Sequence, residues 1–368
     1  MSKRYFLALI TALATLSSAS VAKDNITLEK LGEKLFFDTS LSEPAGQSCA
    51  SCHDAKAGMA DPDQDLPVSR GVHPDRFGDR NTPSAAYAMY SPPFHFDEQE
   101  QLYVGGQFWD GRAATLEEQA KGPFLNPVEM ANPDIGSVIR KVRATSYASD
   151  FDTLFGTDSL DDENTAYEHV ASAIAAFERS ERFRPFSSKY DLYLAGKVTL
   201  SAQEQRGLEL FKAEDKGNCA ACHPADIQED GTPPLFTDFT YDNLGVPRNR
   251  HSPFYKQDSA FNPAGHGYVD IGLVKTTGRN EDKGKFKVST LRNIALTAPY
   301  MHNGAMQVLR EVVDFYNTRD TRSDWGAPEV AENVNTEELG DLGLSDEEVE
   351  DIVAFMRTLT DGYTPAAN

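Results

Sequence analysis

All four cysteines of the chain belong to two copies of one motif, Cys-x-x-Cys-His. The copies are Cys49-Ala-Ser-Cys52-His53 and Cys219-Ala-Ala-Cys222-His223. Two thiols one helical turn apart can each add to a haem vinyl group, and the adjacent imidazole can become the proximal ligand of the iron. Disulfides or a zinc site made by the four thiolates would also use Cys-x-x-Cys pairs, but neither explains a histidine after each pair. The motif therefore predicts two covalently bound haem c groups and redox chemistry.

The segments that must position the two motifs form a weak internal repeat. Residues 31–36 (LGEKLF) precede the first motif much as residues 206–211 (RGLELF) precede the second, and each is predicted as a helix entering a haem pocket. A further helix is predicted from about 166 to 179. Near the end of the chain, Ser345 is a predicted N-cap, and the apolar stripe that follows it predicts a helix packed on a core. The stripe consists of Val349, Ile352, Val353, Met356 and Leu359.

Between these helices the chain is rich in Gly, Pro, Asn and Asp and has few alternating runs, which predicts long ordered loops. The expected fold is therefore mainly α with extensive coil, in two cytochrome c-like haem domains. We place the N-terminal domain at residues 23–190 and the C-terminal domain at residues 191–368. The boundary is expected between about 185 and 200.

The first 22 residues have the pattern of a secretory signal peptide. Lys3 and Arg4 precede an apolar stretch at residues 5–16 and a small-residue cleavage site that ends at Ala22. The stretch is short for a bilayer span, and no later segment approaches the roughly 20 apolar residues that a transmembrane helix needs. Export together with covalent haem attachment predicts a soluble periplasmic protein.

The mature chain is strongly acidic. Its formal charge changes from −22 to −24 when Lys3 and Arg4 leave with the signal peptide, because that peptide holds no acid. Such a charge argues against a nucleic-acid partner. It would favour a basic electron donor through long-range steering, and it is equally consistent with a solubility adaptation that involves no partner.

Six short blocks, in a fixed order, carry a resemblance to a known family. They are residues 35–38 (LFFD), 80–83 (RNTP), 108–112 (FWDGR), 126–130 (NPVEM), 291–293 (LRN) and 298–304 (APYMHNG). With these blocks the chain resembles the bacterial di-haem cytochrome c peroxidase and MauG superfamily over nearly its whole mature length. The resemblance implies that the N-terminal haem reacts with peroxide and that the C-terminal haem transfers electrons.

The resemblance also implies that Gln119, Pro123 and Glu129 form the distal pocket of the N-terminal haem. Cleavage of the peroxide O–O bond needs a group that takes a proton from the iron-bound oxygen and delivers it to the leaving oxygen, which the Glu129 carboxyl can do. Gln119 can only orient or hydrogen-bond. Trp109 matches the tryptophan that lies between the two haems, where an oxidisable indole relays electrons; a buried core aromatic is its ordinary alternative.

A calcium ion between the two domains is a further implication of the family. Asn81, Thr297 and Pro299 match its ligand positions, where one side-chain oxygen, two backbone carbonyls and waters suit a hard cation. His302 is expected to support the second haem by hydrogen bonding. The remaining histidines match no ligand position; they are His95, His169, His251 and His266.

The sixth ligand of the C-terminal haem separates the branches of the family, because classical peroxidases use Met and MauG-type proteins use Tyr. This chain has Tyr316 at the family's offset after His302, and Met301 is the rival ligand. Thioether ligation favours ferrous haem, whereas phenolate ligation favours higher oxidation states. The chain also has His73, eight residues before Asn81, where classical peroxidases place a removable distal ligand of the N-terminal haem. The two signatures therefore point to different branches.

Three functions are compatible with these residues. The first is a di-haem c-type peroxidase that reduces hydrogen peroxide with electrons from a small redox protein such as a cytochrome c or a cupredoxin. The second is a MauG-like enzyme that uses peroxide and a high-valent di-haem state to oxidise a Trp or Tyr of a partner protein. The third is a non-enzymatic di-haem electron carrier, which would not need Glu129. Classical members of the family often pair into homodimers on calcium binding, and the sequence leaves the oligomeric state of this chain open.

Overall fold

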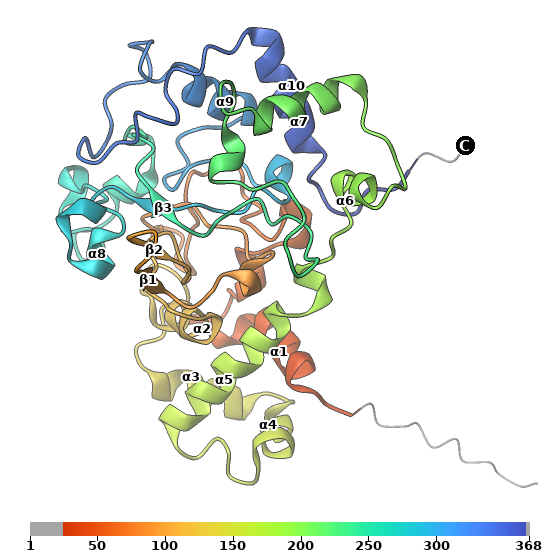
Figure 1. The fold of residues 1–368 in the computed structure, drawn as a ribbon. Helices are drawn as coiled ribbons and strands as arrows, with labels where there is room; N and C mark the ends of the chain where they lie inside the picture. Colours follow the sequence, from red (N-terminus) through yellow and green to blue (C-terminus); the bar gives the residue numbers. More distant parts are fainter. Residues whose placement is uncertain (1–24, 366–368) are drawn as a thin grey trace, which may run out of the picture.

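The computed structural model describes residues 25–365, so the predicted signal peptide lies outside the described residues. This part of the chain is mainly helical with long loops, as expected, and it also contains two small antiparallel sheets (Figure 1). The helices are α1 (Leu28–Phe37), α2 (Leu116–Leu125), α3 (Ile135–Ala144), α4 (Ala148–Phe155), α5 (Glu163–Glu178), α6 (Lys189–Leu194), α7 (Ala202–Lys212), α8 (Val274–Thr277), α9 (Leu309–Thr318) and α10 (Asp346–Arg357). The strands are β1 (His95–Asp97), β2 (Leu102–Val104), β3 (Tyr241–Asp242) and β4 (Phe286–Lys287); β1 pairs with β2 and β3 with β4.

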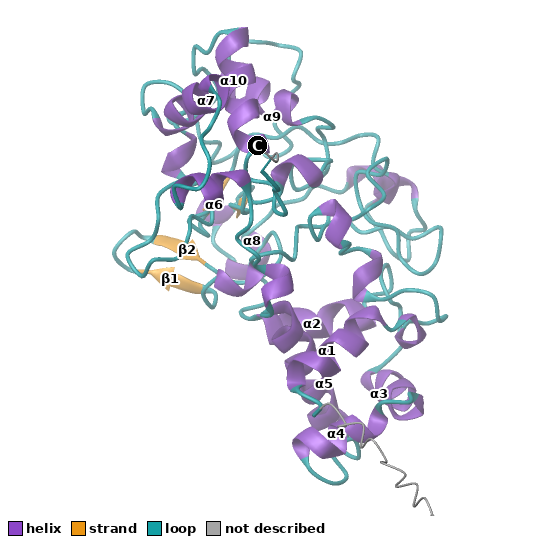
Figure 2. Ribbon diagram, turned by 90° about the vertical axis from the view of Figure 1, so that its right-hand side faces the viewer, coloured by secondary structure: helices purple, strands orange, loops and turns teal. Residues whose placement is uncertain are grey.

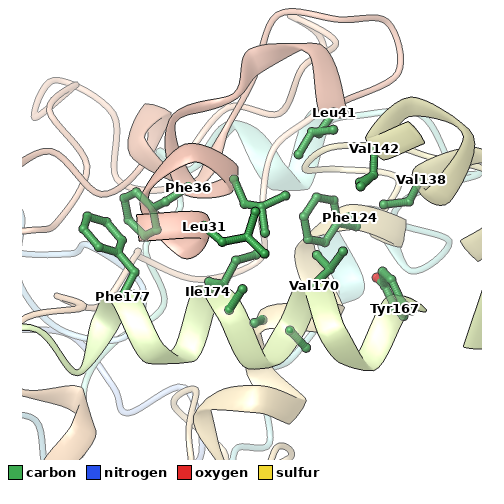
Figure 3. Close-up of a cluster of buried hydrophobic side chains, with 14 of the residues drawn as sticks. Leu31, Phe36, Leu41, Phe124, Val138, Val142, Tyr167, Val170, Ile174 and Phe177 are labelled. Atoms are coloured by element: carbon green, nitrogen blue, oxygen red, sulfur yellow. The ribbon is translucent and has the colours of Figure 1, made fainter. Parts of the chain in front are cut away.

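One hydrophobic core lies in the N-terminal half of the chain, where α1 packs along α5 and α2 and α3 lie against α5 (Figure 3). Leu31 and Phe36 of α1 lie beside Ile174 and Phe177 of α5, and Phe124 of α2 extends the same cluster. The rings of Phe36 and Phe177 meet edge to face, with centroids 5.3 Å apart. This core supports the first Cys-x-x-Cys-His segment.

A second core lies in the C-terminal half, where α7 packs along α10 and α9 lies against α10. The rings of Phe211 on α7 and Phe355 on α10 meet with centroids 5.1 Å apart. Ser345 caps α10 through a reciprocal capping box with Glu348, which confirms the predicted start of that helix. The helices of the two cores gather at opposite ends of the molecule, and loops, the short helices α6 and α8, and the strands β1 and β2 lie between them (Figure 2). Two cores agree with two haem units, and the predicted boundary near residue 190 stays a prediction.

The internal repeat is explained by two equivalent helix crossings. A Cβ atom on Gly32 of α1 would lie 1.8 Å from the carbonyl oxygen of Ala173 on α5. A Cβ atom on Gly207 of α7 would lie 1.9 Å from the carbonyl oxygen of Asp351 on α10. Only glycine allows the two backbones of each pair to approach this closely. The glycine shared by LGEKLF and RGLELF is therefore the contact point of one helix pair in each half.

We expect Gly207→Ala to destabilise the protein by about 3 kcal/mol, at the upper end of the usual cost of overpacking. The added methyl group would clash with the backbone of α10, which cannot move aside as a side chain could. Gly267→Ala is the matched control, since nothing lies within 4 Å of a Cβ atom added there. Thermal unfolding of the two haem-loaded variants checks the prediction. Equal melting temperatures would show that α7 and α10 separate at little cost.

Candidate haem sites and the residues between them

The first Cys-x-x-Cys-His segment forms one wall of a cavity of about 160 Å³. Cys49, Cys52 and His53 all line it. Nδ1 of His53 donates a hydrogen bond to the carbonyl oxygen of Met59 at 2.9 Å, which leaves Nε2 available to an iron. Burial lowers the pKa of His53, so the imidazole is held in the neutral form that binds metals.

The second segment repeats this arrangement in a separate and larger cavity of about 260 Å³. Cys219, Cys222 and His223 line it, and Nδ1 of His223 donates to the carbonyl oxygen of Phe236 at 2.7 Å. Burial lowers the pKa of His223 to about 4. Two thiols, one oriented imidazole and apolar walls fit a covalently bound haem c at each site.

The alternatives for the cysteines do not match this geometry. None of the four cysteines forms a disulfide. The two pairs line different cavities, so they cannot share one zinc ion. Across residues 25–365, no group of three or more His, Cys, Asp or Glu side chains is arranged to hold a metal ion. The haem interpretation is therefore the one that the structure supports.

The residues proposed for the distal pocket lie together on the wall of the first cavity. Gln119 and Pro123 come from α2, and Glu129 follows shortly after its end. Asn126, the C-cap residue of α2, donates from Nδ2 to Oε1 of Glu129 at 2.7 Å. Burial raises the pKa of the Glu129 carboxyl, and the positive charge of Arg112 and the hydrogen bond from Asn126 partly oppose this shift. The site therefore holds a carboxyl with a raised pKa in a fixed position.

The loop that carries His73 passes beside the pocket, but His73 is not among the residues that line the first cavity. The amide of Val72 donates to the carbonyl oxygen of Glu129 at 2.9 Å. A Cβ atom on Gly71 would lie 2.3 Å from the carbonyl oxygen of Val128, so the loop is packed closely on the segment that carries Glu129. Ligation of the first iron by His73 stays a prediction, and it would require this loop to move.

Eight residues line both cavities, and Trp109 is the one among them with an oxidisable side chain; the others are Asn81, Thr82, Pro83, Ser84, Ala88, Gln107 and Phe108. The indole N–H of Trp109 donates to the carbonyl oxygen of Asn81 at 2.8 Å, and its own carbonyl oxygen accepts from the amide of Lys287 at 2.9 Å. The amide of Asn81 in turn donates to the carbonyl oxygen of His302 at 2.7 Å. Partners from both halves of the chain thus hold the indole in the wall shared by the two sites.

Both proposed sixth ligands of the second haem lie on the wall of the larger cavity. Tyr316 is on α9, and Met301 is in the turn before it. Burial raises the pKa of the Tyr316 hydroxyl, so the free phenol is protonated and would lose its proton on binding a ferric iron. Met301 has a left-handed backbone with φ of +71°. His302 lines the same cavity with its ring stacked on Phe286, at 3.6 Å between centroids.

The three residues proposed for calcium also lie at this cavity. The Asn81 side chain uses its amide nitrogen to bond the carbonyl oxygen of Pro67 at 3.2 Å. Within the described chain, Oδ1 of Asn81 and the carbonyl oxygens of Thr297 and Pro299 accept no hydrogen bond. Three neutral oxygens are therefore available to a hard cation.

Sequence reasoning missed two residues of the first cavity. Glu178 of α5 is only 6% exposed, its Oε2 has no hydrogen-bond partner, and burial raises its pKa to about 8. Its position at the charged end of a predicted helix gave no sign that this carboxyl would be buried. Arg112 lies over the ring of Phe108 at 3.6 Å and donates to Oδ1 of Asp110 at 2.8 Å. Arg112 belongs to the FWDGR block, so the family resemblance in the sequence could have identified it as a residue of the site.

Two candidate haem c sites in one mainly helical chain, with a tryptophan in the wall of both, are the arrangement expected of a di-haem c-type redox enzyme. A family profile described as di-haem cytochrome c peroxidase matches residues 27–199. The methylamine utilization protein MauG of Paracoccus denitrificans is 41% identical to this chain, over 96% of this chain and 93% of the relative. Cytochrome c551 peroxidase of Nitrosomonas europaea is 32% identical, over 93% and 82%. The chain belongs to the di-haem cytochrome c peroxidase and MauG family, which confirms the resemblance seen in the sequence.

A solved structure agrees with this assignment. The diheme peroxidase BthA of Burkholderia thailandensis matches with a TM-score of 0.81 and 36% sequence identity, over 91% of this chain and 86% of that chain. The protein is therefore an oxidoreductase of the di-haem peroxidase type with covalently bound haem c. No helix within residues 25–365 is long and apolar enough to cross a membrane.

Proposed function

We propose that this enzyme reduces hydrogen peroxide at the first haem site, with electrons that enter at the second site from a small redox protein. The main observation behind this proposal is that Trp109 lies in the wall of both cavities. The candidate acid–base residue Glu129 lines the first cavity alone. Bound haem supplies the iron that binds and reduces peroxide. The side chains of the protein supply proton transfer at one site and electron entry at the other.

Glu129 is the proposed proton-transfer residue. Its carboxylate takes the proton from one peroxide oxygen, and the resulting acid returns it to the other oxygen as that oxygen leaves. The raised pKa of Glu129 suits both roles, because a group that titrates nearer to the working pH can accept and release a proton with little cost. Gln119 can orient the bound peroxide through its amide, and Pro123 shapes the same wall.

A MauG-like reaction is the second candidate, and Tyr316 in the wall of the second cavity favours it. An anionic phenolate ligand stabilises oxidised iron, so the second site would share the oxidising equivalents rather than hold an electron in reserve. The substrate would then be a Trp or Tyr of a partner protein. The third hypothesis, an electron carrier without catalysis, lacks support because the relatives are named as peroxidases or MauG.

The setting proposed for this reaction is the periplasm, because the N-terminal pattern predicts export and haem c is attached after export. The formal charge of −24 after removal of the signal peptide favours a donor with a basic face. We include one calcium ion, held by Asn81, Thr297 and Pro299, since their oxygens are available at the wall shared by the two halves. Homodimer formation stays a prediction.

We expect Trp109→Phe to slow electron transfer between the sites at least about tenfold, which corresponds to about 1.4 kcal/mol in the barrier. The test mixes peroxide with enzyme whose second haem has been reduced and follows oxidation of that haem by rapid-mixing absorbance. The matched control is Trp325→Phe. Trp325 is the other tryptophan of the chain, it packs on Phe315, and it lines neither cavity.

Equal rates for wild type, Trp109→Phe and Trp325→Phe would contradict the relay. The two candidate reactions are separated by their products. Catalytic oxidation of a reduced basic cytochrome c by peroxide supports the donor-driven reaction, whereas mass spectrometry that finds oxidised Trp or Tyr in a partner protein supports the MauG-like one. Absence of any peroxide reaction in the di-haem protein would overturn both.

A further inference from the structure

Lys287, the last residue of β4, lies on the wall of the second haem cavity. Its Nζ donates to Oγ of Ser91 at 2.6 Å and also donates to the carbonyl oxygen of Gly106. The ring of Phe239 lies 5.4 Å from the same nitrogen. All of these partners are uncharged, and Ser91 and Gly106 come from the other half of the chain. The half-buried ammonium group is therefore held in place without an anion.

The other cations of this region each have a carboxylate partner. Lys283 pairs with Glu332 at 2.6 Å. Arg292, the other Lys or Arg on the cavity wall, pairs with Asp191 at 2.8 Å. No ion pair within residues 25–365 includes Lys287. Lys287 is thus the one Lys or Arg on the described wall of this cavity that the chain does not neutralise.

An unpaired buried ammonium is costly, because the interior does not replace the water that solvates it. Burial lowers the pKa of Lys287 to about 7, in keeping with this cost. The four acids on the same wall have other partners. Asp270 forms an ion pair with Arg80 and Glu329 forms one with Arg248, whereas Asp242 and Glu338 accept hydrogen bonds from the side-chain amide of Asn335. The anion that this position fits must come from the molecule that occupies the cavity.

We propose that Lys287 is the counter-ion of a propionate carboxylate of the haem attached at Cys219 and Cys222. A charge-assisted hydrogen bond from Nζ would neutralise both groups inside the cavity. Because Ser91 and Gly106 hold Nζ from the N-terminal half, the same bond would tie the second haem to both halves of the chain. A positive charge fixed beside this haem stabilises the ferrous form, so Lys287 raises the reduction potential of the second site.

The test is a redox titration of the di-haem protein, followed by absorbance, without peroxide or electron donor. Lys287→Met should shift the ferrous-to-ferric ratio of the second haem about tenfold toward ferric at a given potential, or about 59 mV for one electron. Lys287→Arg should keep the wild-type potential. The matched control is Lys283→Met, which removes an equal charge from an exposed pair and should leave the potential unchanged. The shift should persist at high salt, because a buried pair is weakly screened.

Equal potentials in Lys287→Met and Lys283→Met, with both haems retained, would overturn the proposal and leave Lys287 a structural hydrogen-bond donor. If Lys287→Met does not accumulate, Lys287→Gln decides the question, because Gln is uncharged and keeps an N–H for the Gly106 carbonyl. Haem content of each variant is measured from the absorbance of the denatured protein. No step of this test involves peroxide turnover, so its result is independent of the proposed function.

Discussion

We expect Glu129→Gln to lower the rate of peroxide reduction by about 10²–10⁴-fold, the usual contribution of a general acid–base group, while both haems stay attached. Gln has the size of Glu and can still accept the hydrogen bond from Asn126, but it cannot take a proton from peroxide. Steady-state turnover and the single-turnover reaction with peroxide both report the loss. The haem content should equal that of the wild type, because the Glu129 side chain forms its hydrogen bond with Asn126, which lies outside both Cys-x-x-Cys-His motifs.

Glu98→Gln is the control for this prediction, since it removes a carboxylate from an exposed residue just after β1. It should leave turnover unchanged. Wild-type turnover in Glu129→Gln would show that another group moves the proton, and Glu178, a buried carboxyl on the wall of the same cavity, would be the next residue to replace.

The pH profile gives an independent check on Glu129. Burial raises its pKa above the ordinary value of 4.5, and the carboxylate is the form that accepts the proton. The rate of the peroxide reaction should therefore be high above this raised pKa and fall as the pH decreases through it. Glu129→Gln should lack this acid limb. An acid limb that stays in the variant would assign the titration to a different group.

We expect Tyr316→Met to raise the reduction potential of the second haem by at least about 0.1 V, because axial ligands tune haem potentials over a range of about 0.8 V. A phenolate is an anion that stabilises ferric iron, whereas a thioether is neutral and favours ferrous iron. Electron paramagnetic resonance and absorbance spectra of the low-spin haem should change with the ligand. The oxidised state that follows stoichiometric peroxide should also decay faster in the variant.

Met301→Leu is the companion variant, since Met301 lies on the same cavity wall. If Tyr316 is the ligand, the low-spin signature survives in Met301→Leu and changes in Tyr316→Met. The reverse pattern would assign the ligand to Met301 and would favour the classical peroxidase branch. Tyr316→Phe separates loss of the ligand atom from loss of the ring, because it keeps the aromatic packing of α9.

Some features of this protein were accessible from short stretches of sequence. The two Cys-x-x-Cys-His motifs were visible because haem attachment uses thiols and an imidazole at fixed spacing along one turn. The start of α10 was visible because a capping box acts within four residues. The start of α5 was placed too late: the helix begins at Glu163, where the side chain of Asp162 caps it by accepting from the amide of Thr165 at 2.9 Å.

Other features depended on segments that are far apart in the chain. The sequence showed a repeated glycine in LGEKLF and RGLELF, but only the structure shows that Gly207 meets the backbone of Asp351. The family motifs pointed to Trp109, and only the fold places this residue in the walls of both cavities.

By itself, the sequence determined the family and the helical character of this protein and predicted the haem attachment points, because local spacing and periodicity carry that information. The tertiary structure decided which charges are paired. Lys283 and Lys287 are four residues apart and look alike in the sequence, yet Lys283 reaches Glu332 and Lys287 is half-buried among neutral partners. The physical reason is that burial and ion pairing depend on where distant segments pack, and local spacing does not encode that packing.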